Sequence, residues 1–146
     1  MMRPEGDRLP FFVYGTLRPG ERNHDVHLRG RVGAESPARL PGAVLYEGPG
    51  YPYLLEDPEG GPVCGELITA LPSAYDRLLA DLDALEVYAP GDPRNLYERV
   101  VREVTLLDGS TTRAWVYVAA VRVAAGLRAS GAVIEGGDWA AFRAYR

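Results

Sequence analysis

The chain has 146 residues, with 16 basic and 20 acidic side chains that give a formal net charge of -4 at pH 7. This balance argues against general affinity for nucleic acid or for anionic membrane surfaces. The single cysteine, Cys64, excludes an intramolecular disulfide and the cysteine-rich zinc motifs.

The length and the N-terminal segment indicate the class of protein. A chain of this size can bury roughly 68–70% of its unfolded surface, so we expect one domain over residues 1–146. The first ten residues, MMRPEGDRLP, have charges and prolines where a signal peptide has an apolar run. No later segment is long and apolar enough to span a bilayer. We therefore expect a soluble cytoplasmic protein.

The first third of the chain predicts short strands and one short helix. The apolar run FFVY at 11–14 is typical of a buried strand. The polar segment 20–30 predicts a short helix that is capped by Asn23. Between 38 and 62, short apolar pieces alternate with proline and glycine, which indicates strands joined by tight turns.

A strand and the clearest helix follow. The run VCGELITA at 63–70 predicts a strand, in which Gly65 marks a bulge or a bend. The segment 72–86 has apolar residues at helical spacing, and Pro72 suits the first helical position. Leu71 precedes it, so the helix lacks a side-chain cap.

The last third predicts a hairpin and a terminal helix. The strand-like segments 97–107 and 111–119 flank Asp108 and Gly109, a dipeptide that favours an antiparallel hairpin. A short terminal helix is indicated by the spacing of Trp139, Phe142 and Tyr145. Many strands with one substantial amphipathic helix predict an α+β fold on a mostly antiparallel, barrel-like sheet.

One carboxylate lies where an apolar residue is expected. At about 100° per residue, Glu86 falls about 20° from Tyr75, inside the apolar stripe of the predicted helix. A carboxylate in apolar surroundings has a raised pKa, which suits proton transfer at neutral pH. The alternative is that the helix ends at Glu86 and turns its side chain outward to water. The stripe is formed by Tyr75, Leu78, Leu79, Leu82 and Leu85.

Other candidate residues have ordinary explanations. His24 and His27 could contribute to a metal site, but a solvated helical face explains the same spacing and no third ligand is evident. Cys64 has no activating base nearby in sequence, so a buried small side chain is its default interpretation. Tyr97 and Arg99 share one face of a strand and could reach a ligand carboxylate, whereas an internal ion pair or an exposed arginine explains Arg99 equally well.

Taken in order, seven segments resemble the gamma-glutamylcyclotransferase-like family. The resemblance covers nearly the whole chain, and its most specific part is the Tyr-Gly-Thr-Leu element near the N-terminus together with the later Leu-Asp-x-x-Glu. The segments are VYGTLRPG from residue 13, YPYL at 51–54, VCGEL at 63–67, LDALE at 82–86, YERVVREV at 97–104, AWVYV at 114–118 and GGDW at 136–139.

This resemblance implies a small mixed β-barrel with flanking helices and a cavity for a gamma-glutamyl group. In active members the glutamate of the second motif is the general acid/base, a role that falls on Glu86 here. Tyr97 matches an aromatic position that borders the pocket, while Val87 stands where the family commonly has glycine. The backbone N–H groups that line the cavity would come from Tyr14, Gly15, Thr16 and Leu17.

The reaction that the resemblance implies is the cyclisation of a gamma-glutamyl amide to 5-oxoproline, with release of the free amine. It requires no metal and no cofactor, and the expected partner is a small gamma-glutamyl substrate. Two alternatives stay open: a non-catalytic module that binds a carboxylate-bearing ligand, and an enzyme that removes a gamma-glutamyl protecting group from a biosynthetic intermediate. The sequence does not specify the leaving amine or the oligomeric state.

Overall fold

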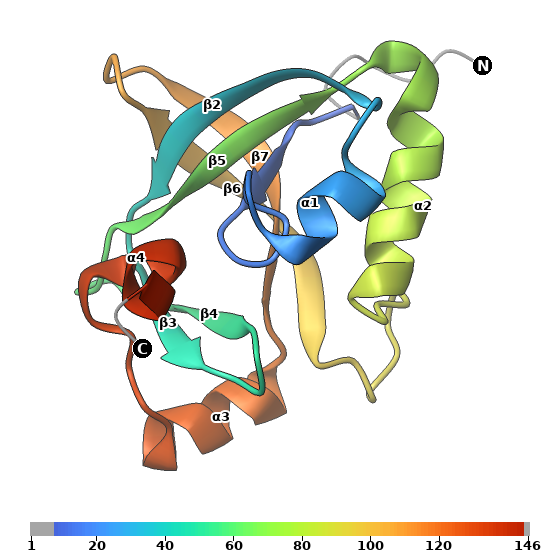
Figure 1. The fold of residues 1–146 in the computed structure, drawn as a ribbon. Helices are drawn as coiled ribbons and strands as arrows, with labels where there is room; N and C mark the ends of the chain where they lie inside the picture. Colours follow the sequence, from blue (N-terminus) through green and yellow to red (C-terminus); the bar gives the residue numbers. More distant parts are fainter. Residues whose placement is uncertain (1–7, 145–146) are drawn as a thin grey trace.

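The computed structural model describes residues 8–144 and shows a small barrel with helices around it (Figure 1). Its strands are β1 Phe11–Val13, β2 Val32–Leu40, β3 Ala43–Glu47, β4 Pro52–Glu56, β5 Val63–Ala70, β6 Tyr97–Leu106 and β7 Thr111–Ala119. The barrel is closed in the order β1-β5-β2-β6-β7, and β3 and β4 form a separate two-stranded sheet.

The barrel is mixed because β1 lies between strands of opposite direction. It pairs antiparallel with β5 and parallel with β7, where Phe11 lies opposite Trp115. The other barrel pairings, β2 with β5, β2 with β6 and β6 with β7, are all antiparallel. The predicted α+β fold with a small mixed, mostly antiparallel barrel is confirmed.

The predicted hairpin joins β6 and β7. Their register runs from Tyr97 opposite Ala119 to Thr105 opposite Thr111. In the turn, Gly109 has a φ of 88°, and the Asp108 Oδ1 accepts a 2.8 Å hydrogen bond from the Ser110 N–H. A positive φ is readily adopted by glycine, which is why this dipeptide predicted the turn correctly.

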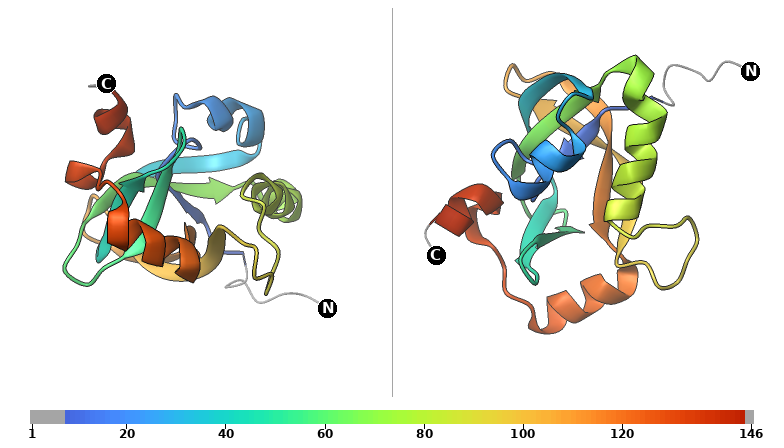
Figure 2. Two further views of the ribbon diagram at one scale, coloured as in Figure 1. Left: turned by 90° about the horizontal axis from the view of Figure 1, so that it is seen from below. Right: turned by 45° about the vertical axis from the view of Figure 1, so that its right-hand side comes forward.

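The helices surround the barrel on several sides. In the views of Figures 1 and 2, α2 runs along one side of the barrel and α3 lies below it. No helix within residues 8–144 has the length and apolar character needed to cross a membrane. The helices are α1 Arg22–His27, η2 Pro72–Ala74, α2 Tyr75–Leu85, α3 Val121–Ser130, η3 Glu135–Gly137 and α4 Trp139–Ala144.

The predicted helix over 72–86 is a 3-10 turn followed by an α-helix. Pro72 is near its start, and Leu71 makes no side-chain cap, as expected. The terminal helix α4 is also present, although Tyr145 lies outside the described residues. The helix α3 was not anticipated, because it has no side-chain cap and buries only Ala124 fully.

The capping role predicted for Asn23 is wrong. Glu21 occupies the N-cap position of α1, and no side chain caps that helix. Asn23 instead donates from its Nδ2 to the Thr16 Oγ1 at 2.8 Å. Its side chain therefore holds the loop that follows β1 rather than the start of α1.

No bulge forms at Gly65, so the first of the two alternatives predicted there is wrong. Gly65 pairs in register with Ala38, and the irregularity of this strand pair lies between Val32 and Ala34. A Cβ at Gly65 would lie 2.2 Å from the Val13 carbonyl oxygen and 2.9 Å from the ring of Phe12. Glycine is required there because β1 approaches β5 very closely.

The two faces of β1 are buried in two different clusters of the core. Phe11 and Val13 pack with residues of α2, including Tyr75, Leu78 and Leu82. Side chains on the opposite face of β1, those of Phe12 and Tyr14, pack with Leu67, Val104, Val116, Ile134 and Trp139. Burial on both faces explains the uninterrupted apolar run at 11–14, since such strands do not alternate in polarity.

We expect Gly65→Ala to lower the free energy of unfolding by about 2–3 kcal/mol, because the added methyl group would overlap the backbone of β1. Gly126→Ala is the matched control, since nothing lies within 4 Å of the place that its methyl group would occupy in α3. This substitution should raise the free energy of unfolding by about 0.5–1 kcal/mol. Urea unfolding of the two variants measures both changes, and equal stability of the two would contradict the close approach.

Candidate active site

The chain leaves the barrel directly after β1 and turns at Gly15. The Arg18 N–H donates to the Gly15 carbonyl oxygen at 3.0 Å, which closes this turn. A Cβ at Gly15 would lie 2.9 Å from the Cδ of Pro52. The glycine therefore allows the loop to pass close to the start of β4.

The loop presents free main-chain donors. Within residues 8–144, the amide N–H groups of Gly15, Thr16 and Leu17 donate no hydrogen bond to the protein. Consecutive free amides on a loop are a common way to bind a carboxylate or an oxyanion. These three N–H groups are therefore available to a ligand.

Arg18 fixes this loop to the rest of the molecule. Its Nε and Nη2 donate to the two carboxylate oxygens of Glu66, at 2.8 and 3.2 Å, and its Nη1 donates to the Asp138 Oδ1 at 2.8 Å. Such a bidentate pair of hydrogen bonds strongly restricts the relative orientation of the guanidinium and the carboxylate. The contacts join the loop to β5 and to the residue that precedes α4.

Glu86 follows α2 directly, and the helix ends in a Schellman motif. The N–H groups of Val87 and Tyr88 donate to the carbonyl oxygens of Ala84 and Asp83, at 3.1 and 2.8 Å. Val87 has a φ of 53°, a left-handed conformation that glycine normally provides at this position. The helix therefore ends at Glu86, as in the alternative that the sequence left open. The side chain of Glu86, however, is not turned out to water.

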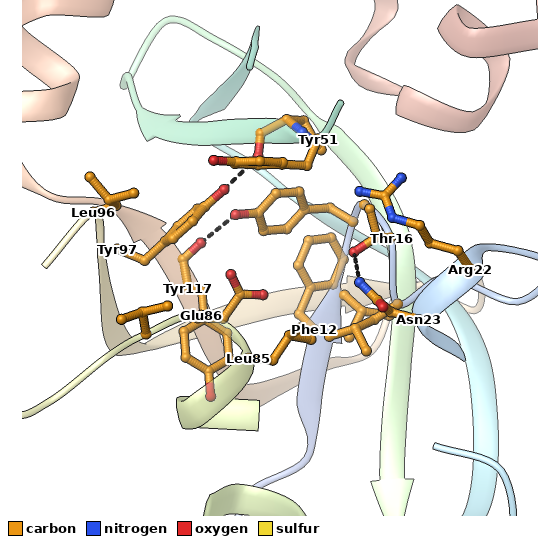
Figure 3. Close-up of a pocket in the computed structure, with 16 residues that line it drawn as sticks. Phe12, Thr16, Arg22, Asn23, Tyr51, Leu85, Glu86, Leu96, Tyr97 and Tyr117 are labelled. Carbon is orange, nitrogen blue, oxygen red and sulfur yellow. Dashed lines mark hydrogen bonds between the residues drawn. The ribbon is translucent and has the colours of Figure 1, made fainter. Parts of the chain in front are cut away.

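The Glu86 carboxylate points into a cavity of about 250 Å³ (Figure 3). The structure brings every predicted site residue to this cavity: Tyr14, Gly15, Thr16, Leu17, Glu86 and Tyr97. The Tyr-Gly-Thr-Leu element and the glutamate, some seventy residues apart in sequence, thus meet in one place.

Burial raises the pKa of Glu86 to about 7. Within the described part of the chain, its carboxylate forms no hydrogen bond and no ion pair that would favour the charged form. Desolvation without a compensating cation is the physical cause of such a shift. Glu86 is therefore divided between its acid and base forms at neutral pH.

Tyrosines surround the carboxylate. Burial raises the pKa of Tyr14, Tyr97 and Tyr117 well above the usual range, and the proximity of Glu86 raises each further. The Tyr14 hydroxyl donates to the Tyr117 carbonyl oxygen at 2.5 Å, and the Tyr97 hydroxyl donates to the Pro52 carbonyl oxygen at 3.0 Å. These tyrosines stay neutral at physiological pH, and Glu86 is the acidic side chain among them whose pKa lies near neutrality.

Arg99 is not in this cavity. Its Nε donates to the Asp83 Oδ1 at 2.9 Å, and its guanidinium lies 4.3 Å from the centre of a Trp115 ring. The Tyr117 hydroxyl donates to the same Asp83 oxygen at 2.6 Å. The internal ion pair, one of the two alternatives for Arg99, is the one observed.

The remaining candidates lie elsewhere, and several lining residues were missed. His24 contacts the Glu35 carboxylate, and Cys64 lies on a separate surface pocket, so neither reaches Glu86. The sequence reasoning assigned no site role to Arg22, Asn23, Tyr51, Pro52 or Tyr117, all of which line the cavity. The family resemblance gave a signal for three of these, because Tyr51 and Pro52 lie in the segment YPYL and Tyr117 lies in AWVYV.

Comparison with known proteins agrees with this geometry. Residues 11–141 match the family model described as gamma-glutamyl cyclotransferase, AIG2-like. The chain belongs to this family. The match spans the loop after β1, the Glu86 cavity and the whole barrel.

Individual members of the family show how far the likeness extends. The chain is 38% identical over 108 residues to the gamma-L-glutamyl-butirosin B gamma-glutamyl cyclotransferase of Niallia circulans, an alignment that covers 73% of this chain and 64% of that protein. It thus spans less than two thirds of that relative's length. An AIG2-like protein from Mus musculus superposes with a TM-score of 0.55 at 28% identity, over 77% of each chain. An uncharacterized protein from Pyrococcus horikoshii superposes with a TM-score of 0.62 at 22% identity, over 94% of each chain, and shares the fold.

We expect Glu86→Gln to stabilise this family member above pH 7 and to have little effect near pH 5. The raised native pKa means that the folded protein holds the Glu86 proton between about pH 4.5 and 7 whereas the unfolded chain has lost it. Stability is therefore lost as the pH rises through this window, by about 3 kcal/mol at pH 8. Unfolding of wild type and variant from pH 5 to 8 measures the difference, with the exposed Glu103→Gln as control. A difference that is constant over this range would contradict burial of an ionisable Glu86.

Val87→Asn should raise the free energy of unfolding by about 1 kcal/mol, because asparagine tolerates the left-handed conformation that a β-branched residue resists. Val26→Asn is the control, since Val26 is similarly exposed, at 71% against 77%, but lies in α1 with no positive φ. Thermal or urea unfolding compares the two variants. A gain in both would assign the effect to the loss of an exposed apolar side chain instead of the backbone.

Proposed function

We propose that this protein is a gamma-glutamyl cyclotransferase that converts a gamma-glutamyl amide to 5-oxoproline and a free amine. The observation that carries the proposal is the meeting of a desolvated carboxyl group, Glu86, with the free amides of the loop after β1 in one cavity. Membership of the family supports the same activity.

The proposed reaction is intramolecular. The free α-amine nitrogen of the glutamyl group attacks the side-chain amide carbonyl carbon, and the new bond closes a five-membered ring. The original carbon–nitrogen bond then breaks and releases the amine. A cavity that holds the glutamyl chain in its folded conformation promotes this step, because well-oriented intramolecular reactions reach effective molarities of about 10⁵–10⁸ M.

Glu86 acts as the general base and then as the general acid. In its ionised form it takes a proton from the attacking amine, and it returns that proton to the departing nitrogen. A pKa near 7 suits both transfers at neutral pH, and such catalysis contributes roughly 10²–10⁴-fold in rate.

The other site residues bind the substrate. The backbone N–H groups along Tyr14, Gly15, Thr16 and Leu17 hold the glutamyl carboxylate or the developing oxyanion. Tyr97 borders the glutamyl group, with its hydroxyl oriented by the Pro52 carbonyl oxygen.

A second candidate within the same chemistry is removal of a gamma-glutamyl protecting group from a biosynthetic intermediate. The relative from Niallia circulans, which is named for gamma-L-glutamyl-butirosin B, favours it. The two candidates differ only in the leaving amine, so a substrate panel separates them.

Wild type is expected to release 5-oxoproline from at least one member of a panel of gamma-glutamyl dipeptides, gamma-glutamyl-ε-lysine and larger gamma-glutamyl amines. Glu86→Gln should lower kcat by about 10²–10⁴-fold, because it removes the group that transfers the proton. Glu103→Gln, an exposed control on β6, should keep wild-type activity. In wild type, kcat/KM should rise with pH up to an inflection near 7 as Glu86 ionises.

Two results would overturn the proposal. One is the absence of 5-oxoproline with every substrate of the panel, which would favour a non-catalytic binding module. The other is full activity in Glu86→Gln, which would remove the proposed acid/base from the mechanism.

A further inference from the structure

A second cavity of about 480 Å³ adjoins the one that contains Glu86. Arg22 and Tyr51 line both, so the two cavities meet at these side chains. The second cavity is bordered on its other sides by Trp139, Phe142 and Arg143 of α4 and by Glu47 of β3. A ligand that fills the first cavity and extends into the second therefore passes Arg22.

Arg22 is held at this junction by the main chain and not by an acidic side chain. Its Nη2 donates to the Gly50 carbonyl oxygen at 3.0 Å. Within residues 8–144, no carboxylate lies within 4.0 Å of its guanidinium. Figure 3 shows the Arg22 side chain beside Thr16 and Asn23, on the opposite side of the cavity from Leu96 and Tyr97.

The other arginine of these cavities is already engaged. The Arg143 Nη2 lies 2.9 Å from the Glu21 Oε1, and its guanidinium is 5.0 Å from the centre of a Trp139 ring. Glu21 is buried and occupies the N-cap position of α1, so this ion pair holds Arg143 at the N-terminal end of that helix. Among the residues that the structure describes, Arg22 is therefore the cation that the two cavities leave for a bound anion.

Guanidinium groups bind carboxylates through paired hydrogen bonds, and an arginine without a protein carboxylate is suited to one from a ligand. In the proposed function the loop amides at 15–17 hold the glutamyl carboxylate. A carboxylate that binds Arg22 must therefore come from another part of the substrate. The part of a gamma-glutamyl amide that extends from the first cavity is the leaving amine. Resting on the proposed function, we infer that Arg22 selects gamma-glutamyl amides whose leaving amine bears a carboxylate, as in gamma-glutamyl amino acids and peptides.

Paired substrates test this selection. Gamma-glutamyl-alanine and gamma-glutamyl-ethylamide differ only in the carboxylate of the leaving amine, and gamma-glutamyl-4-aminobutyrate and gamma-glutamyl-propylamide are a second such pair with a longer reach. Wild type should show a kcat/KM about 10–100-fold higher for the carboxylate-bearing member of at least one pair, as expected of a charged hydrogen bond. The preference should appear mainly in KM.

Arg22→Gln should bring this ratio close to one, and Arg22→Lys should restore part of it because the positive charge is kept. Arg77→Gln, at an exposed position of α2, is the control and should keep the wild-type ratio. Glu86→Gln should lower turnover of both members of a pair and leave their ratio in place.

Several outcomes would overturn the inference. Equal kcat/KM for both members of each pair in wild type would show that no carboxylate is selected. An equal loss for both members in Arg22→Gln would assign Arg22 to the glutamyl group that they share. Release of 5-oxoproline from the larger gamma-glutamyl amides but from none of these four substrates would also overturn it. Failure of the proposed function is a different result, because wild type would then release no 5-oxoproline from any substrate, the larger amides included.

Discussion

The burial of β1 on both faces is the constraint on which the rest of the structure depends. Its pairing with β5 on one side and β7 on the other closes the barrel, and its two faces contribute to two core clusters. A strand so enclosed cannot shift without opening the barrel. The chain therefore emerges after Val13 at a fixed place, and the loop amides of Gly15 to Leu17 follow from it.

The other half of the site depends on where α2 ends. Asp83 and Glu86 are three residues apart, yet Asp83 is engaged by Arg99 and Tyr117 whereas Glu86 faces the cavity among tyrosines. The ion pair of Asp83 ties the last turn of α2 to β6, and the Tyr117 hydrogen bond ties it to β7. The same turn therefore contains one carboxylate that anchors the helix and one that is desolvated at the cavity. At Val87, the Schellman motif that sets the direction of Glu86 places a β-branched residue in a costly left-handed conformation.

The junction at Arg22 links the cavity to the C-terminal helix. Arg143 is held by buried Glu21 and stacks on Trp139, so α4 is fastened to the start of α1 where Arg22 lies. Arg22 follows the first motif by two residues, whereas the helix α4 that borders the same junction lies more than fifty residues after Glu86.

Local pattern determined much of this protein. The apolar run at 11–14, the Asp108-Gly109 turn and the stripe that includes Glu86 depend on backbone preferences and on burial within one element, so the strand, the hairpin and the misplaced carboxylate were all predictable. The family resemblance added the pairing of Glu86 with the loop at 14–17. Tertiary structure alone decided that Asn23 holds Thr16, that Gly65 admits β1, and that Arg99 forms an ion pair with Asp83 whereas Arg22 is held by a carbonyl oxygen. Each of these depends on which side chain arrives from a distant strand or helix, and no local spacing specifies that arrival.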